Sequence, residues 1–275
     1  MHRTTGTPAL RRWLVGGASL VLAATMVGCG SDDDSGDASA TTSAAAENDP
    51  AAFCEAAVDA ESAVTSGPPI DFETATPEEI QAALEEFSAQ VEPQLAAAEE
   101  AAPEEISADV TTLTGLIRQV LETGDDTLFE QPEYTNADNA IDEYMLAECG
   151  FEQIEATGVD YEYEGIPDTL PAGVVAITFS NEGEELHEIG LARVNDDVTT
   201  PLEELLALPE EEVLSMIEFK GAAFAAPNEA DTTFMRLEAG RYGAACFIPK
   251  GTTHDTEGSG PPHFTLGMFA EFTVE

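Results

Sequence analysis

The chain has 275 residues, of which 55 are acidic and nine are basic, so its formal net charge is −46. This charge repels nucleic acid and anionic membrane surfaces, and we exclude both as direct electrostatic partners. It is consistent with attraction of a basic protein partner, and equally with plain colloidal solubility.

The first 28 residues have the features of an export signal. Three arginines precede or border an apolar stretch from residue 13 to 27, and no acidic residue occurs before Asp32. A charged segment followed by a short apolar one is typical of a signal peptide, not of a fold element. The stretch ends in Met26-Val-Gly-Cys29, which resembles a bacterial lipobox. The resemblance implies that Cys29 is lipidated after cleavage, and cleavage by the general signal peptidase is the alternative.

Residues 29–50 are rich in Ser, Ala, Thr, Asp and Gly and show no apolar periodicity. This composition predicts a disordered acidic tether, with a root-mean-square length of roughly 25 Å. Without the signal, six basic residues stand against 55 acidic ones, a net charge of −49. We expect the protein on the extracytoplasmic face of the cell membrane, held there through its lipid anchor.

Residues 51–150 show the periodicity of amphipathic helices. Thr76-Pro77-Glu-Glu79 predicts a capped helix start, because Thr is a good N-cap and Pro is favoured at the first helical position. Apolar residues then follow at spacings of three and four. Another helix is predicted from Pro103 to Gly124, and two more over 53–64 and 137–149. Four such helices with short connections favour an antiparallel bundle.

From residue 157 to 275 the pattern changes to short strands. The predicted strands are Val159–Tyr163, Val174–Phe179, Ile189–Val194, Thr232–Leu237, the segment around Tyr242 and a closing strand. A helical insertion is predicted over 202–219, interrupted at Pro209. We therefore expect a two-domain α+β protein: an all-α bundle over 51–150, then a Greek-key β-sandwich with a helical insertion over 157–275.

Four side chains of the β region are candidate copper ligands. Tyr242 precedes Cys246 by four residues, Pro262-His263 follows, and Gly267-Met268 comes five residues after the His. His187 lies upstream, after an apolar segment and Asn181. A thiolate, two imidazoles and a weak thioether form the ligand set of copper sites that transfer single electrons.

These residues resemble the plastocyanin and azurin family of cupredoxins, in which a Tyr-x-x-x-Cys strand leads to Pro-His, then Gly-Met and a final strand. The resemblance implies copper bound by His187, Cys246 and His263 with Met268 as the axial ligand. It also implies electron transfer or copper handling with a redox or copper-handling protein partner. The family usually places two to four residues between Cys and His, whereas this chain has sixteen.

The longer connection adds only roughly 1.5 kcal/mol of loop-closure entropy, so entropy does not exclude the copper site. The inserted run is rich in turn-forming residues, and this composition predicts a surface excursion. His254 lies in this run, eight residues after Cys246, and competes with His263 as a ligand. We expect His254 to be a solvated loop residue instead.

Cysteine placement follows from export into an oxidising compartment, where paired cysteines are expected. With Cys29 lipidated, Cys54 and Cys149 remain in the helical domain and are expected to form a disulfide. Cys246 then stays reduced, as a copper thiolate requires. The sequence contains no glycine-rich phosphate loop and no nucleophile elbow, so we expect no enzyme. A cupredoxin-scaffold interaction module without metal is the alternative function.

Lipidation of Cys29 is directly testable. A chain that carries more than one acyl group should stay with the membrane, because two anchoring signals give stable attachment. In detergent phase partitioning the wild type should enter the detergent phase and Cys29→Ala the aqueous phase. Release of both proteins into the aqueous phase would show that the anchor is absent.

Overall fold

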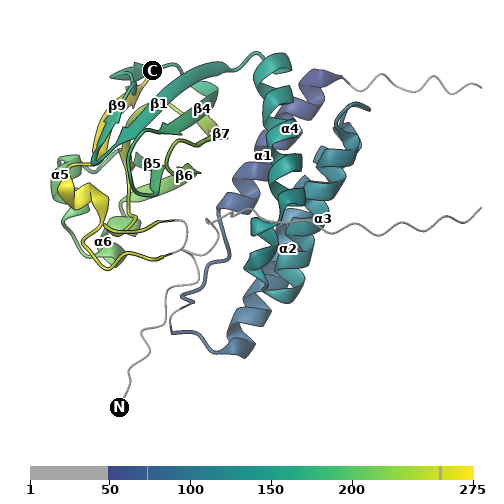
Figure 1. Cartoon of the computed structure of the whole chain (residues 1–275), viewed down its shortest axis with the longest axis horizontal. Helices are drawn as coiled ribbons and strands as arrows, with labels where there is room; N and C mark the ends of the chain where they lie inside the picture. The colour runs from purple at the N-terminus through teal and green to yellow at the C-terminus, as the bar shows by residue number, and fades with distance from the viewer. Residues whose placement is uncertain (1–48, 73, 254–255) are drawn as a thin grey trace, which may run out of the picture.

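A computed structural model describes residues 49–275 except residues 73, 254 and 255. The export signal, Cys29, the tether up to residue 48, and His254 lie outside the described residues. A helical region stands beside a β region in this structure (Figure 1). Within the described part of the chain, no helix combines the length and the apolar character needed to cross a membrane.

Four α-helices form the N-terminal region. They are α1 (Pro50–Thr65), α2 (Pro77–Ala101), α3 (Ser107–Thr123) and α4 (Pro132–Glu148), with a short 3₁₀ helix η2 (Asp126–Glu130) before α4. Helix α2 begins at the predicted residue, because Thr76 and Glu79 form a capping box. The Thr76 hydroxyl accepts a hydrogen bond from the Glu79 N–H at 3.3 Å, and the Glu79 carboxylate accepts one from the Thr76 N–H at 2.8 Å.

Three helix starts differ from the prediction. Helix α1 begins at Pro50, three residues before the predicted start at 53. Helix α3 begins at Ser107 and not at Pro103, because residues 103–106 form a turn in which the Ile106 N–H donates to the Pro103 carbonyl at 3.1 Å. Helix α4 begins at Pro132, five residues before the predicted start at 137. Proline at the first helical position lacks only an N–H that would have no partner within the helix.

The β region consists of two sheets. The strands are β1 (Glu152–Val159), β2 (Glu162–Glu164), β3 (Thr169–Leu170), β4 (Gly173–Asn181), β5 (His187–Val194), β6 (Ile217–Ala225), β7 (Ala230–Leu237), β8 (Gly240–Ala245) and β9 (Phe269–Val274). One sheet has the order β2-β1-β4-β7 and the other β3-β9-β8-β5-β6. Both sheets are mixed, because β1 pairs with β4 and β3 with β9 in parallel, whereas the other neighbours are antiparallel.

Three boundaries of the β region are corrected. Strand β1 begins at Glu152, before the expected domain start at 157, and the predicted strand 159–163 is divided by a turn between β1 and β2. The helical insertion is two short helices, α5 (Leu202–Leu206) and α6 (Glu210–Leu214). It ends early because residues 217–219 pair with β5 as part of β6.

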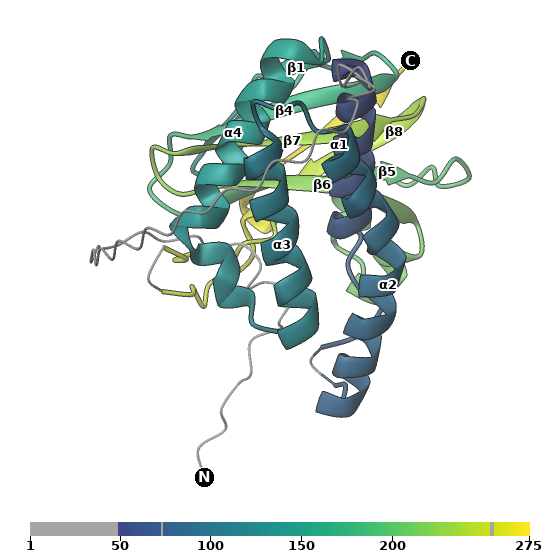
Figure 2. The same cartoon turned by 90° about the vertical axis from the view of Figure 1, so that its right-hand side faces the viewer.

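One apolar cluster draws side chains from both sheets. Ile177 of β4, Leu191 of β5 and Tyr242 of β8 each have 2% or less of their surface exposed. Burial of such side chains is the main favourable contribution to folding. In the view of Figure 2 the strands cross behind the upper parts of the helices, so the helical region covers one side of the β region.

Helix α1 packs against β7, an outer strand of its sheet. An edge strand leaves backbone N–H groups unpaired, and Glu61 of α1 supplies the acceptor. Its carboxylate accepts hydrogen bonds from the Thr233 hydroxyl at 2.7 Å and from the Phe234 N–H at 3.0 Å. Arg236 of β7 pairs with Glu55 of α1 at 2.7 Å. The helical region thus caps a sheet edge with side-chain acceptors.

A group of carboxyl groups lies at this contact. It contains Glu61 of α1, Asp138 and Asp142 of α4, and Asp231 of β7; one oxygen from each aspartate lies within 4.8 Å of the others. Burial raises the pKa of Glu61 to about 8 and that of Asp231 to about 6. Burial and neighbouring carboxylates also raise the pKa of Asp138 and Asp142. The folded interface therefore favours protonated carboxyl groups.

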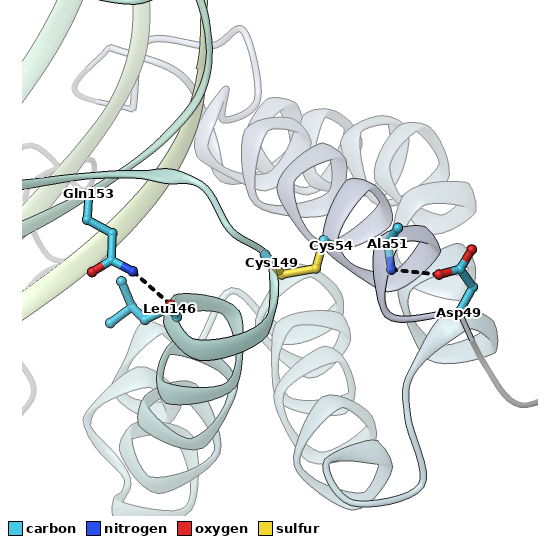
Figure 3. The surroundings of a disulfide bond; sticks show 6 residues. All are labelled: Asp49, Ala51, Cys54, Leu146, Cys149 and Gln153. Carbon is cyan, nitrogen blue, oxygen red and sulfur yellow. Dashed lines mark hydrogen bonds between the residues drawn. A yellow bond between two sulfur atoms is a disulfide. The ribbon is translucent and has the colours of Figure 1, made fainter.

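A disulfide joins the two ends of the helical region (Figure 3). Cys54 in the second turn of α1 is bonded to Cys149, the residue after α4, with the Cα atoms 5.6 Å apart. This is the pairing expected from the sequence. Gln153 of β1 donates to the carbonyl of Leu146 in α4 at 2.7 Å, so the chain is held on both sides of the passage from helix to sheet.

The cluster of four carboxyl groups at the interface predicts a loss of stability as pH rises. A carboxyl whose folded-state pKa is raised stabilises the fold while it is protonated, and this contribution is lost as pH rises through the folded-state pKa. For Glu61 the window runs from its ordinary value of 4.5 to about 8. Thermal melting with EDTA present should show a falling Tm between about pH 5 and 8. Asp142→Asn should flatten this fall and Glu143→Gln, an exposed neighbour, should not; a Tm that does not fall would contradict the prediction.

The disulfide predicts a large stability difference. The bonded cysteines are separated by 95 residues, and the chain-entropy account gives up to about 4.7 kcal/mol for a loop of about this length. A Cys54→Ala/Cys149→Ala double variant should unfold at lower denaturant concentration by circular dichroism. Reductant should produce a similar loss in the wild type and none in the variant. Equal midpoints for all samples would show that the bond contributes nothing.

Candidate metal centre

The four predicted ligands come from three places in the fold. His187 is the first residue of β5, Cys246 follows the last residue of β8, and His263 begins the 3₁₀ helix η3 (His263–Leu266). Met268 lies between η3 and β9. All four residues are completely buried. The structure therefore brings them into one interior region, as the sequence pattern predicts.

Backbone hydrogen bonds join three of these residues directly. The N–H of Cys246 donates to the carbonyl of Met268 at 3.1 Å, and the N–H of Phe264 donates to the carbonyl of Cys246 at 2.8 Å. The N–H of Met268 donates to the carbonyl of His263 at 3.2 Å. Gly267 makes this tight return with a φ of 118°, which disfavours any residue with a Cβ. The spacing from His263 to Met268 is thereby fixed by the main chain.

The long connection between Cys246 and His263 closes on itself. The N–H of His263 donates to the carbonyl of Ile248, and the N–H of Lys250 donates to that of Pro261, both at 3.0 Å. The N–H of Gly260 donates a hydrogen bond to the carbonyl of Lys250 at 3.0 Å. These bonds join the two ends of the connection, and the chain re-enters beside Cys246.

The donor atoms of the two histidines and the cysteine converge. The Nδ1 atoms of His187 and His263 are 3.0 Å apart, and the Sγ of Cys246 lies 3.3 Å from the Nδ1 of His263. All three atoms lie within 4.8 Å of one another. Two imidazole nitrogens and one sulfur in such an arrangement are a ligand set for copper, zinc or another soft to borderline metal.

The outer nitrogen of each imidazole meets a carboxylate. Nε2 of His187 lies 2.8 Å from Asp160, and Nε2 of His263 lies 3.1 Å from Glu185. Metal-binding histidines commonly donate their second N–H to a carboxylate, which fixes the ring and its tautomer. Gly183 allows the first of these contacts, because a Cβ there would overlap both Asp160 and the ring of His187.

The carboxylates stay ionised although they are partly buried. Burial raises the pKa of Asp160, but hydrogen bonds from His187 and from the Glu184 N–H outweigh it and hold the pKa below its ordinary value. Burial likewise raises the pKa of Glu185, and bonds from Gly251, Tyr161 and His263 reverse the direction. An ionised carboxylate only accepts hydrogen bonds, so each Nε2 carries the proton.

The proton positions decide whether the residues fit a metal. Burial lowers the pKa of His263 below its ordinary value, so this imidazole is neutral at pH 7. With its proton on Nε2, the Nδ1 of His263 is a lone pair that points at His187 and Cys246. A buried lone pair of this kind needs a proton donor or a metal ion as its partner. The arrangement therefore fits a metal ion bound through the Nδ1 atoms and the sulfur.

Further contacts support the cysteine. The N–H of Glu188 lies 3.5 Å from the Sγ of Cys246, where it can stabilise a thiolate. The Glu188 side chain accepts the N–H of Phe247 at 2.6 Å and so holds the residue after the cysteine. Among the described residues, Cys246 is the cysteine outside a disulfide. The methyl group of Met268 faces Gly158, where a Cβ would lie only 3.1 Å from it.

Sequence reasoning did not find Asp160, Tyr161 or Glu185. Glu185 stands two residues before His187, yet it is one of several glutamates in that turn, and periodicity does not distinguish them. Asp160 is 27 residues from His187 in the chain and reaches it only through the pairing of β1 with β4. Nothing in the local sequence marks either carboxylate as a partner of an imidazole.

No family model matches the chain, and neither does any curated protein. Several solved structures are similar to its C-terminal part. An auracyanin from the photosynthetic bacterium Roseiflexus castenholzii is 21% identical, covers 45% of this chain and 96% of its own, and has a TM-score of 0.31. Auracyanin A, a "blue" copper protein from Chloroflexus aurantiacus, is 21% identical over 46% of this chain and 100% of its own, with a TM-score of 0.30.

Rusticyanin from Thiobacillus ferrooxidans is 16% identical over 45% of this chain and 76% of its own, with a TM-score of 0.30. The chain therefore spans most of the length of these proteins. All three are cupredoxins, the family that the motifs around Cys246 and His263 resemble.

Proposed function

We propose that the C-terminal region binds one copper ion through His187, Cys246 and His263, with Met268 as the axial ligand, and that it transfers electrons. The observation that carries this proposal is the convergence of the two Nδ1 atoms and the sulfur within 4.8 Å. When bound in such a set, copper supplies one-electron exchange between Cu(I) and Cu(II). We also propose that the two sheets form the Greek-key β-sandwich of a cupredoxin.

The chain's own residues would hold the ligands still. Cys246, His263 and Met268 are joined by main-chain hydrogen bonds, and both imidazoles are oriented by carboxylates. Ligands that are positioned before the metal arrives need not move when its charge changes. Rigid placement of this kind supports electron transfer.

Complete burial of all four side chains favours electron transfer over copper delivery. Delivery requires a partner's ligands to reach the metal and replace those of the donor, one after another. A ligand set whose members have no exposed surface offers no position for the first exchange. Copper handling therefore takes second place, and the expected partner is a redox protein with a basic surface.

We further propose that the protein works as a lipid-anchored electron carrier, not as an enzyme, on the outer face of the cell membrane. The lipobox-like Met26-Val-Gly-Cys29 and the acidic tether support this location. The tether would let the folded part reach neighbouring proteins over roughly 25 Å while it remains attached. The strongly negative charge would speed association with a basic partner and make it sensitive to salt.

The copper site is tested by loading the mature chain with Cu(II). We expect an intense visible thiolate-to-copper band that survives dialysis, and its loss in Cys246→Ser. Met268→Leu should keep the metal and change its reduction potential, because an axial ligand tunes the site more than it holds the ion.

His254→Ala serves as the control in that experiment, since this residue is expected to bind no metal. Circular dichroism should confirm that each variant is folded. If the wild type shows neither the band nor retained copper, the metal hypothesis is wrong. The protein is then better described as an interaction module on a cupredoxin scaffold.

A further inference from the structure

The carboxylate of Glu185 joins three segments that are distant in the sequence. Its Oε1 accepts a hydrogen bond from the hydroxyl of Tyr161 at 2.9 Å, and its Oε2 accepts one from Nε2 of His263 at 3.1 Å. The same Oε2 accepts the N–H of Gly251. These partners belong to the turn between β1 and β2, to η3, and to the long connection between Cys246 and His263.

These contacts cover the outer edge of His263. The ring of Tyr161 lies 4.8 Å from the imidazole of His263, centroid to centroid. The ammonium group of Lys250 stands 5.0 Å over the Tyr161 ring, in a cation–π contact. His263 is fully buried as a result. Lys250 and Gly251, near the start of the Cys-to-His connection, are thus held beside a predicted ligand.

We propose that Glu185 is the positioning residue of the metal centre: it holds the proton of His263 on Nε2 and fastens the Cys-to-His connection over that imidazole, so that bound copper exchanges slowly. This inference rests on the proposed copper site and adds the residue that controls its closure. Glu185 acts through His263 and is not itself a ligand.

A carboxylate is required because it is the acceptor in all three contacts. A glutamine at position 185 presents one accepting oxygen and one donating NH₂ group. The NH₂ group would face either the N–H of Gly251 and Nε2 of His263 or the hydroxyl of Tyr161. In the first case the donor opposes the Nε2 proton and favours its transfer to Nδ1, the atom that the metal needs. In the second case the amide oxygen still accepts both N–H groups, but it lacks the negative charge of the carboxylate and holds the Nε2 proton less strongly.

Asp160 has a narrower role. It holds Nε2 of His187 and accepts the N–H of Glu184, both within the adjoining turns. Among the described residues, it forms no hydrogen bond or ion pair with the Cys-to-His connection. Each carboxylate therefore orients one imidazole. Glu185 is the one that also bonds the Cys-to-His connection, beside the main-chain bond from the Leu186 N–H to the Thr252 carbonyl at 3.0 Å.

The test compares Glu185→Gln with Glu184→Gln in the mature chain. Glu184 is the exposed neighbour, so the control makes the same chemical change and the same change in net charge. We expect Glu185→Gln to bind Cu(II) about tenfold or more weakly, the range seen when partners of metal-binding histidines are changed. A copper chelator should remove the metal faster by a similar factor, and Glu184→Gln should match the wild type.

The metal-free protein gives an independent measurement. Nitrogen-15 NMR of the histidine rings should show His263 with its proton on Nε2 in the wild type and in Glu184→Gln. Glu185→Gln should raise the fraction of His263 rings that carry the proton on Nδ1, because both amide orientations hold the Nε2 proton less strongly than the carboxylate does. This reading separates positioning from a general loss of stability, because a merely structural substitution leaves the tautomer unchanged.

Tyr161→Phe provides a second variant that keeps the aromatic ring and removes only the hydroxyl bond to Glu185. It should release copper faster than the wild type and more slowly than Glu185→Gln, and it carries the test if Glu185→Gln does not fold. Wild-type rates and tautomers in folded Glu185→Gln, or a wild-type release rate in Tyr161→Phe when Glu185→Gln does not fold, would overturn the proposal. If the wild type binds no copper, the proposed function fails, and the tautomer comparison still decides the role of Glu185.

Discussion

The candidate metal centre depends on the backbone hydrogen bonds that join the end of β8 to the segment before β9. Through them Cys246 is bonded to Met268 and Phe264, and His263 is bonded to Ile248. They hold a thiol and an imidazole side by side at the two ends of a sixteen-residue connection. A site built in this way accommodates a long connection, because the chain closes at its base.

The same hydrogen bonds separate the geometry of the site from the length of the connection between Cys246 and His263. The bonds from His263 to Ile248 and from Lys250 to Pro261 close the connection at its base, where the sulfur and the imidazole nitrogen lie 3.3 Å apart. Loop-closure entropy grows only slowly with length, so such an excursion costs little. Gly251, near the start of the connection, bonds to Glu185 and so helps to cover His263. The inserted residues are thus connected to the site by the carboxylate of Glu185 and by the bond from the Leu186 N–H to the Thr252 carbonyl at 3.0 Å.

Much of the fold could be predicted from local patterns. The capping box at Thr76, the apolar spacing of α2 and the apolar run of β4 are all signals carried by neighbouring residues. The proximity of three candidate ligands was predictable for a related reason, since Cys246, His263 and Met268 lie within 23 consecutive residues. The ends of elements that depend on pairing with a distant strand were not predictable. Residues 217–219 were expected in a helix but form the start of β6, because they pair with β5.

The carboxylate contacts were beyond sequence reasoning for the same physical reason. A chain with 55 acidic residues offers many candidates for each buried polar role, and only the pairing of distant strands selects among them. Asp160 and Glu185 each face an imidazole. Against the effect of burial, the pKa of Asp160 is lowered chiefly by the bond from His187, and that of Glu185 by the Gly251 N–H, then by Tyr161 and His263. Glu61 and Asp142 were selected by the packing of helices on β7, and burial raises their pKa. Acidic residues are therefore kept ionised beside the imidazoles, whereas at the contact between the helices and β7 burial favours their protonated form.

The distribution of positive charge connects these centres to function. Arg118, Arg193, Lys220, Arg236 and Arg241 each pair with a carboxylate of the chain, so their charges are largely neutralised locally. The remaining acidic side chains give the surface its negative field. Such a field acts over about 8 to 10 Å at physiological salt, and it favours the approach of a basic surface. For the proposed electron transfer, this field would hold a basic partner near the domain without any contact to the buried side chains of His187, Cys246 and His263.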